Sequence, residues 1–306
     1  TATQNSITTA TGLTTVGAAN TLTTLAGIPF YQGGAGSIYT HDVSGTDNDA
    51  LRNTAYGITT MDAITTGDNN TALGYNTMTA NTTASSNTAV GGEAMLTNTT
   101  GASNVAVGYA ALYTNNGAEN VAIGKDALRL NTTAGQLVAV GHEAMEANTT
   151  GVRNLAIGYQ AYTASDTEND NLAIGYQAML ANTAGGSENI AIGSYALNDL
   201  TSGDYNTVVG HYAGDVLTTG GSNTMIGQQA GSAQTTASHN TLLGAFAGEA
   251  ITTSAYNTAV GKDSLKALVD GDGSNTAVGF EAAMTTTTNT QITAIGYRAL
   301  KVAVAN

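Results

Sequence analysis

The sequence predicts an all-β chain folded as a parallel β-solenoid. Three observations predict it: a motif that recurs at a nearly constant interval, alternation of large and small residues within the motif, and turn-forming residues between copies. With the glycine of "AVG" taken as position zero, the motif occurs 15 times, and successive copies are offset by about seventeen positions, give or take one. These glycines are Gly57, Gly74, Gly91, Gly108, Gly124, Gly141, Gly158, Gly175, Gly193, Gly210, Gly227, Gly244, Gly261, Gly279 and Gly296.

The length and composition of the unit select the solenoid. A unit this short cannot hold two packed helices, and a glycine in every copy would cost each helix about 1 kcal/mol. The segment "TAVG" alternates large and small residues as a strand does, and "TNTTGAS" and "TTGGS" are turn sequences. Two short strands and two turns fit one unit, so each unit should be one turn. With about 4.8 Å between strands, about 15 turns make a rod of roughly 70 Å.

The asparagine at position −4 should form a ladder along the rod. It is present in 13 of the 15 copies, among them Asn87, Asn104 and Asn120, and the exceptions are Leu137 and Ile292. Stacked turns place like residues over like, so the amide side chains should bond from turn to turn. The glycine at position zero should form a corner that a β-carbon would obstruct.

The apolar positions suggest an inside and an outside. Position −1 is large and apolar in every copy, as at Val107 and Ile123, and we expect these side chains to fill the coil. Positions −2 and +3, as at Ala106, are mostly small, and no copy carries a charged residue anywhere from −4 to 0. If the small residues face outward, they allow close approach of other chains, which favours a homotrimer. Val107→Asp should then abolish a soluble trimer, whereas Glu93→Ala should be nearly silent.

The ends of the chain divide it into two regions. Residues 1–52 break the pattern, and residues 53–306 carry the repeats. Pro29, Phe30 and Tyr31 could cap the first turn, which would otherwise expose unpaired strand edges. The alternative is that residues 1–52 dock the rod onto a neighbouring fibre protein.

The composition argues against several classes of function. The net charge is −14 with 8 scattered basic residues, so no basic patch for nucleic acid is expected. Cysteine is absent, and no apolar run approaches the roughly 20 residues of a membrane helix. No catalytic motif or cofactor-binding loop stands out from the repeat. The sequence therefore predicts no enzyme, no cofactor and no membrane span.

Possible cation ligands also have simpler interpretations. His142 and His211 occupy position +1, which accepts many residue types, so a solvated rim position is favoured over metal ligation. The acidic segment 166–170 reads as a solvated loop, with a cation site as the alternative. Segment 270–281 has calcium-loop spacing, but Asn275 stands where glycine is needed. We therefore predict no metal site.

The repeats carry a resemblance to a known family. The units "NTAVGGEAML", "NLAIGYQAML" and "NTMIGQQAG" resemble the head repeats of trimeric autotransporter adhesins, the YadA-like left-handed parallel β-roll. They resemble still more the asparagine-containing variants of bacteriophage tail fibres and other virion fibres. The resemblance covers about residues 53–300, although the period here is longer than in adhesin heads. It implies an elongated homotrimer that reaches a host surface.

The predicted function follows from the rod and the resemblance. We expect a structural fibre protein, a bacteriophage tail or virion fibre shaft or head that mediates host attachment. Its partners would be two further copies, neighbouring fibre or virion proteins, and a host receptor or glycan. The alternative is a bacterial trimeric adhesin head or self-assembling cell-surface filament. Ice binding is disfavoured, because position −3 changes from threonine to Val, Leu or Ile between Val105 and Ile190.

Overall fold

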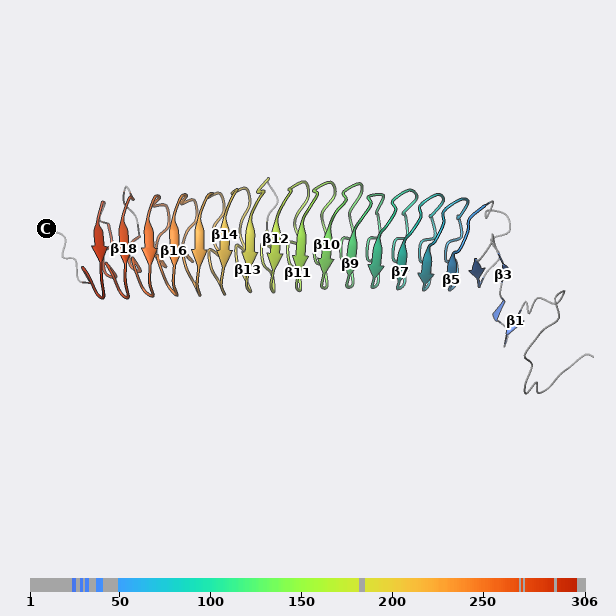
Figure 1. The fold of residues 1–306 in the computed structure, drawn as a ribbon, viewed down its shortest axis with the longest axis horizontal. Helices are drawn as coiled ribbons and strands as arrows, with labels where there is room; N and C mark the ends of the chain where they lie inside the picture. The colour runs from blue at the N-terminus through green and yellow to red at the C-terminus, as the bar shows by residue number, and fades with distance from the viewer. Residues whose placement is uncertain are drawn as a thin grey trace, which may run out of the picture.

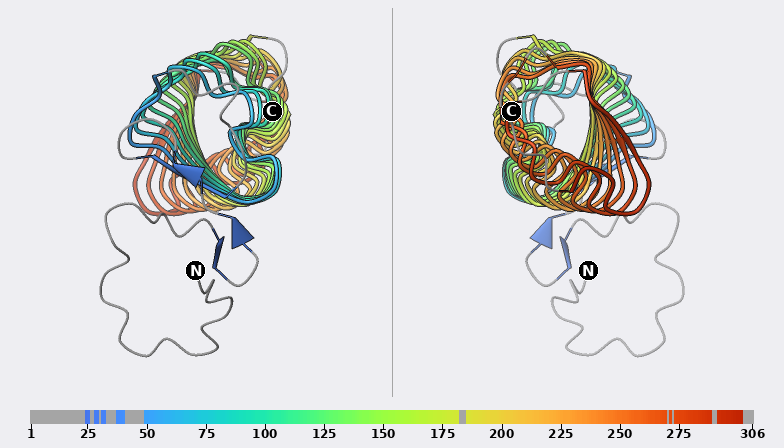
Figure 2. Two further views of the ribbon diagram at one scale, coloured as in Figure 1. Left: turned by 90° about the vertical axis from the view of Figure 1, so that its right-hand side faces the viewer. Right: turned by 90° about the vertical axis from the view of Figure 1, so that its left-hand side faces the viewer.

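The chain forms an elongated rod of stacked turns. The computed structural model describes residues 24–25, 28–29, 31–32, 37–40, 49–181, 185–269, 271, 273–288 and 291–301. Each turn carries one strand, and the strands lie side by side along the rod (Figure 1). Seen down the rod axis, successive turns nearly superimpose and rotate only gradually (Figure 2). The described residues include no helix of the length and apolar character needed to cross a bilayer.

Fifteen parallel strands make up the repeat region and delimit fourteen complete turns. They are β5 (Thr54–Tyr56), β6 (Thr71–Leu73), β7 (Thr88–Val90), β8 (Val105–Val107), β9 (Val121–Ile123), β10 (Val138–Val140), β11 (Leu155–Ile157), β12 (Leu172–Ile174), β13 (Ile190–Ile192), β14 (Thr207–Val209), β15 (Thr224–Ile226), β16 (Thr241–Leu243), β17 (Thr258–Val260), β18 (Thr276–Val278) and β19 (Thr293–Ile295). Equivalent positions pair, as Ala106 does with Ala122. The predicted parallel solenoid, with one repeat unit per turn, is confirmed.

Short strands precede the repeats. β1 (Thr24–Leu25) pairs antiparallel with β2 (Ile28–Pro29), and β3 (Tyr31–Gln32) pairs antiparallel with β4 (Ile38–Tyr39). β4 also pairs in parallel with β5, so it covers the first edge of the ladder. Most of residues 1–52 lie outside the described residues, including Phe30, and their assignment as a cap or docking segment stays a prediction.

Each turn contains one three-residue strand, not the two strands expected. The rest of the turn follows a path of bends whose backbone groups bond to the next turn. Met78 N–H donates to Ala94 O at 3.0 Å, and Met95 N–H donates to Ala111 O at 2.9 Å. The second side of the coil therefore has ladder-like hydrogen bonds without extended backbone.

The interior of the coil is lined by the small residues, which corrects the predicted inside and outside. Position −2 is buried in every turn from Ala55 to Ala294, as Ala106 is at 0% exposure. Positions +3 and +4 complete the core, with buried pairs such as Ala111 and Leu112. The large residues at −1 point outward, and Ile123 is 40% exposed. The coil is so narrow that alanine on the strand faces Met or Leu across it.

Residue volumes are balanced across this narrow interior. In β14, β15 and β16, position −2 is enlarged to Val208, Met225 and Leu242, and position +4 becomes glycine in the same three copies. A β-carbon at Gly231 would lie 2.5 Å from Met225 Sδ and 2.9 Å from Leu242 Cδ1. The large and small residues have exchanged sides, so the glycine offsets the larger side chain on the strand.

The asparagine ladder at position −4 is present as predicted. Asn104 N–H donates to Asn87 Oδ1 at 2.9 Å, and Asn120 N–H donates to Asn104 Oδ1 at 2.9 Å. The amide nitrogen of Asn104 donates to Gly117 O at 2.9 Å. Each side chain thus ties its own strand to the next strand and to a loop, which satisfies buried backbone groups that water cannot reach.

A second buried column lies at position +7. It begins with Ile64 and is polar from Asn81 to Ser165, where Asn98 bonds both the N–H and the C=O of Gly101. From Leu200 to Leu268 its members are apolar apart from Gln234, as at Leu217 and Ile251, and the column is polar again at Thr286. Gln234 sits between Leu217 and Ile251 at 0% exposure, and neither its amide oxygen nor its amide nitrogen has a hydrogen-bond partner.

Gln234→Leu is therefore expected to stabilise the rod. It removes a buried amide that makes no hydrogen bond and gives the position the residue type of the turns on either side. The gain should be about 1–3 kcal/mol, the cost of a buried unsatisfied polar group. The midpoint of denaturant unfolding measures it. Asn98→Leu is the matched control and should destabilise, because Gly101 would lose two hydrogen bonds; a loss of stability in Gln234→Leu would contradict the account.

Candidate interaction surface

An exposed hydrophobic surface runs the length of the rod. We call it the aliphatic stripe: the side chains at position −1 of β5 to β19, together with those at position −3 of β8 to β13. Among its members, Leu73 is 47% exposed, Ile226 is 42% exposed and Ile295 is 68% exposed. Strand residues at −1 and −3 share one face because side chains alternate with period two. The stripe is therefore the outer face of the ladder.

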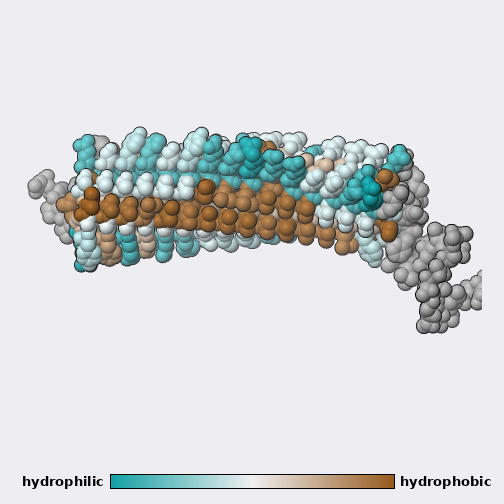
Figure 3. Space-filling view, viewed as in Figure 1, coloured by the Kyte–Doolittle hydropathy of each residue, from teal (hydrophilic) through white to brown (hydrophobic). Residues whose placement is uncertain are grey.

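The stripe is widest in the middle of the rod. From β8 to β13 position −3 is aliphatic, as Val105, Val138 and Ile190 are, whereas it is threonine in the strands before and after. Figure 3 shows the hydrophobic band along the rod and its broader central part. A continuous apolar band of this length exceeds what isolated surface residues give, and such bands mark contact surfaces.

Aromatic rings stack along the edge that follows the stripe. We call this the aromatic ladder; its rings belong to positions +1 and +2 of five successive turns and are His142, Tyr159, Tyr176, Tyr195, His211 and Tyr212. His142 stacks on Tyr159 with ring centroids 5.3 Å apart, and Tyr159 stacks on Tyr176 at the same distance. Burial raises the pKa of Tyr176, and the neighbouring Tyr195 adds to the effect.

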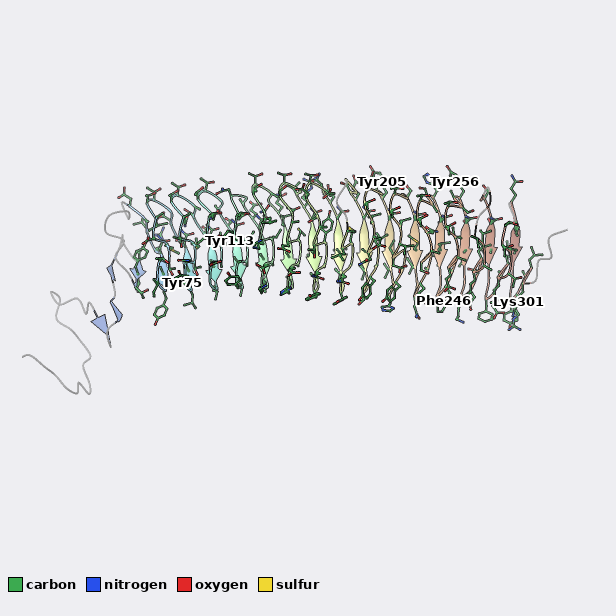
Figure 4. All side chains as sticks on the ribbon, turned by 180° about the vertical axis from the view of Figure 1, so that it is seen from behind. Tyr75, Tyr113, Tyr205, Phe246, Tyr256 and Lys301 are labelled. Atoms are coloured by element: carbon green, nitrogen blue, oxygen red, sulfur yellow. The ribbon has the colours of Figure 1, made fainter. Side chains whose placement is uncertain are left out.

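A second set of aromatic residues lies at position −5, on the opposite edge. His239 stacks on Tyr256 at 5.0 Å, and Tyr205 and Tyr256 are 59% and 62% exposed. Figure 4 shows Tyr205 and Tyr256 along one edge, with Tyr75 and Phe246 along the other. The rod thus presents aromatic residues on both sides of a regular backbone.

Charged residues near these edges pair both between turns and within one turn. Arg153 donates twice to the Asp170 carboxylate at 2.7 Å, and this hydrogen bonding lowers the pKa of Asp170. Burial works to raise the pKa of Asp263, but Lys262 and Lys266 outweigh it and lower that pKa. An exposed pair such as Arg153 and Asp170 contributes little stability by itself.

The predicted repeat residues lie at equivalent places in successive turns. The marking glycines form the corner after each strand, and Asn87, Asn104 and Asn120 lie in the buried ladder. Val107 and Ile123 belong to the aliphatic stripe and not to the coil interior, because the strand places position −2 inward. Position −1 is thus a surface position throughout the repeats.

The acidic segments considered for calcium are held by other partners. Glu168 is buried, and its carboxylate accepts the N–H groups of Asp166, Thr167 and Gly185. Glu281 accepts from Arg298 at 2.7 Å. Asp270 and Asp272 lie outside the described residues.

The aromatic residues at positions +1 and +2 can be recognised in the sequence, but their stacking along successive turns is seen only in the structure. The sequence signal for this stacking is the repeat itself, because residues at equivalent positions of adjacent turns lie one turn spacing apart. The His142 side chain is partly exposed, in keeping with a rim position, and only its Nδ1 is buried, 3.6 Å from Glu143 Oε1. The nearby Asp126, His142 and Glu143 offer ligand atoms within 4.8 Å of one another.

The fold and surface define the class as an elongated parallel β-solenoid with an apolar outer stripe. Comparison with known proteins gives no family model, no curated protein and no solved structure that matches the chain.

Proposed function

We propose that the protein is a structural fibre, a left-handed β-roll that assembles as a homotrimer in a bacteriophage tail or virion fibre and serves host attachment. It has no catalytic role in this proposal. The observation that carries it is the aliphatic stripe, a surface as long as the rod that water should not contact in the working state. The residues quoted above that resemble virion-fibre repeats favour the phage setting.

The stripe is large enough for a specific contact between copies. Fourteen intervals of about 4.8 Å give a length of about 67 Å, and a three-residue strand is about 10 Å wide. The resulting footprint of about 670 Å² is of the order of one side of a standard protein interface. Three stripes that meet along a common axis would remove all of them from water and leave the aromatic edges accessible.

Mechanically, the proposed fibre provides reach and multiple display. Each turn bonds to the next through its strand and bends, and in most turns also through the asparagine ladder, so bending the rod strains many hydrogen bonds together. Three copies side by side would present each edge three times, which raises avidity for a repeated surface receptor or glycan. The exposed tyrosines and variable loops are the groups that would make such contacts.

The test of assembly is a charge placed in the middle of the stripe. Wild-type protein should show a mass near three times 30.6 kDa in light scattering. Ile157→Asp should give a monomer with the same far-ultraviolet circular dichroism, since Ile157 is 38% exposed and outside the coil. A buried unpaired carboxylate at the interface should cost several kcal/mol of association.

Thr133→Asp is the matched control for this experiment. It adds the same charge at an exposed position on another side of the coil and should leave the trimer mass unchanged. A monomeric wild type at micromolar concentration, or an Ile157→Asp variant that remains trimeric, would contradict assembly through the stripe.

A further inference from the structure

The column at position +2 contains two stacked pairs of carboxylates, and they differ in how they are neutralised. Asp126 and Glu143 occupy this position on adjacent turns, and Asp263 and Glu281 do so near the other end of the rod. Adjacent turns are about 4.8 Å apart. Like charges at this separation repel, so each pair needs compensating positive charge.

The pair near the end of the rod is fully neutralised by basic side chains. Asp263 contacts Lys262 at 2.8 Å and Lys266 at 3.0 Å. Glu281 contacts Arg298 at 2.7 Å and also pairs with Lys301. Four cations therefore face two carboxylates, and no charge is left uncompensated there.

The central pair has fewer cations. Asp126 contacts Lys125 at 2.7 Å and Arg129 at 3.5 Å. Among the described residues, no Lys or Arg lies within ion-pairing distance of Glu143, whose nearest basic group is His142 Nδ1 at 3.6 Å. Glu143 Oε2 accepts a hydrogen bond from Gln160 at 2.6 Å, which leaves Oε1 facing the imidazole.

The imidazole is held with one nitrogen toward these carboxylates. His142 stacks on Tyr159 with the ring planes 10° apart, which fixes the ring beside the coil. Its Nδ1 is buried and has no hydrogen-bond partner. An imidazole nitrogen without a hydrogen-bond partner is available to coordinate a metal ion, and Asp126 and Glu143 offer oxygen ligands close to it.

We propose that Asp126, His142 and Glu143 form a binding site for a divalent transition cation such as Zn²⁺. The three ligand atoms lie within 4.8 Å of one another, and ligands of a single zinc ion lie within about 4 Å, so small side-chain rotations complete the set. One nitrogen with two carboxylate oxygens suits zinc, whereas calcium takes oxygen ligands only. The cation would supply the positive partner that the Glu143 carboxylate lacks, and it would join two adjacent turns.

This site does not depend on the fibre proposal. It is built within one chain, and a monomer would hold the ion as well as a trimer. The proposed cation site lies at the aromatic ladder and not on the aliphatic stripe, so assembly through the stripe would leave the site accessible. Failure of either proposal leaves the other standing.

The chain itself offers variants that remove the ligands and keep the fold. The turn carries "GHEAM" at 141–145, and a later turn carries "GYQAM" at 175–179. His142→Tyr with Glu143→Gln therefore copies a sequence that already forms this corner. The double variant retains a ring to stack on Tyr159 and an amide to bond Gln160. Circular dichroism should show an unchanged rod.

Titration calorimetry of the full chain with Zn²⁺ tests the site. Wild type should bind one ion per chain, and the double variant should bind at least tenfold more weakly. In nitrogen NMR spectra, the imidazole signals of His142, and of no other histidine, should shift on addition of Zn²⁺. His211→Tyr is the control, since His211 shares position +1 and is not part of the three-residue cluster, and its binding should equal wild type. No stoichiometric uptake by wild type, or equal uptake by the double variant, overturns the proposal.

Discussion

Ala106→Asp is expected to destroy the folded coil around β8. Ala106 is at 0% exposure and pairs with Ala89 and Ala122 inside the ladder. The carboxylate would lie among alanine, methionine and leucine side chains with no positive partner. An uncompensated buried charge costs about 3–5 kcal/mol. Solenoid turns are stabilised by their neighbours, so several adjacent turns should open together.

Hydrogen exchange resolves this effect along the chain. Ala106→Asp should lose amide protection from β7 to β9 first, and thermal unfolding should begin at a lower temperature. Val107→Asp is the adjacent control in the same strand, because the side chain of Val107 points outward. The Val107→Asp variant should keep the amide protection of the wild-type protein within each chain and affect only the association between chains. Equal loss of protection in the two variants would mean that the inside and outside of the coil are wrongly assigned.

The repeat length and the ladder positions could be predicted because each depends on a local rule. A nearly constant repeat length, with turn sequences between copies, fixes one turn per unit. Glycine at position zero and asparagine at −4 recur because a backbone corner and a buried amide ladder require those residue types. The pairing of Asn87 with Asn104 follows directly from placing like over like.

The orientation of the strand could not be predicted from the same pattern. A period of two separates positions −2 and −1 onto opposite faces but does not say which face is inside. Large residues usually fill a core, so the pattern predicts Val107 inward and Ala106 outward. The reason this failed is the width of the coil: Leu112 and Met95 enter from the opposite side and leave room only for alanine on the strand.

The path between strands was also hidden from the sequence. In each turn the residues at positions −5, +2 and +4 adopt left-handed backbone conformations, and most of them are not glycine. Ser86, Glu93 and Met95 are examples, with φ of 63°, 59° and 52°. These residue types give no signal for such a conformation. It persists because hydrogen bonds between turns hold it, such as Glu93 N–H to Tyr75 O at 2.8 Å. Neighbouring turns, not local propensity, determine these corners.

Gly91→Ala is the second change expected to have a large effect. Gly91 has φ of 133°, a conformation that side chains other than glycine rarely adopt. A β-carbon there would lie 2.5 Å from Gly108 O and 2.7 Å from Gly108 C in the next turn. These Gly108 atoms belong to the backbone of the next turn, so they cannot rotate away as the end of a flexible side chain could. We expect a loss of about 3 kcal/mol or more in the free energy of unfolding, from strain and displaced hydrogen bonds together.

The adjacent glycine provides the control for this argument. At Gly92 a β-carbon would meet Tyr109 Cδ2 at 3.6 Å as its nearest neighbour, which is an ordinary contact. Gly92→Ala should change the free energy of unfolding by less than about 0.5 kcal/mol, the usual range for a surface substitution. Denaturant unfolding of the two variants measures the difference. If the neighbouring turns can shift apart at little cost, the two will unfold at the same midpoint, and the stacked corner will not be the constraint that places glycine in every turn.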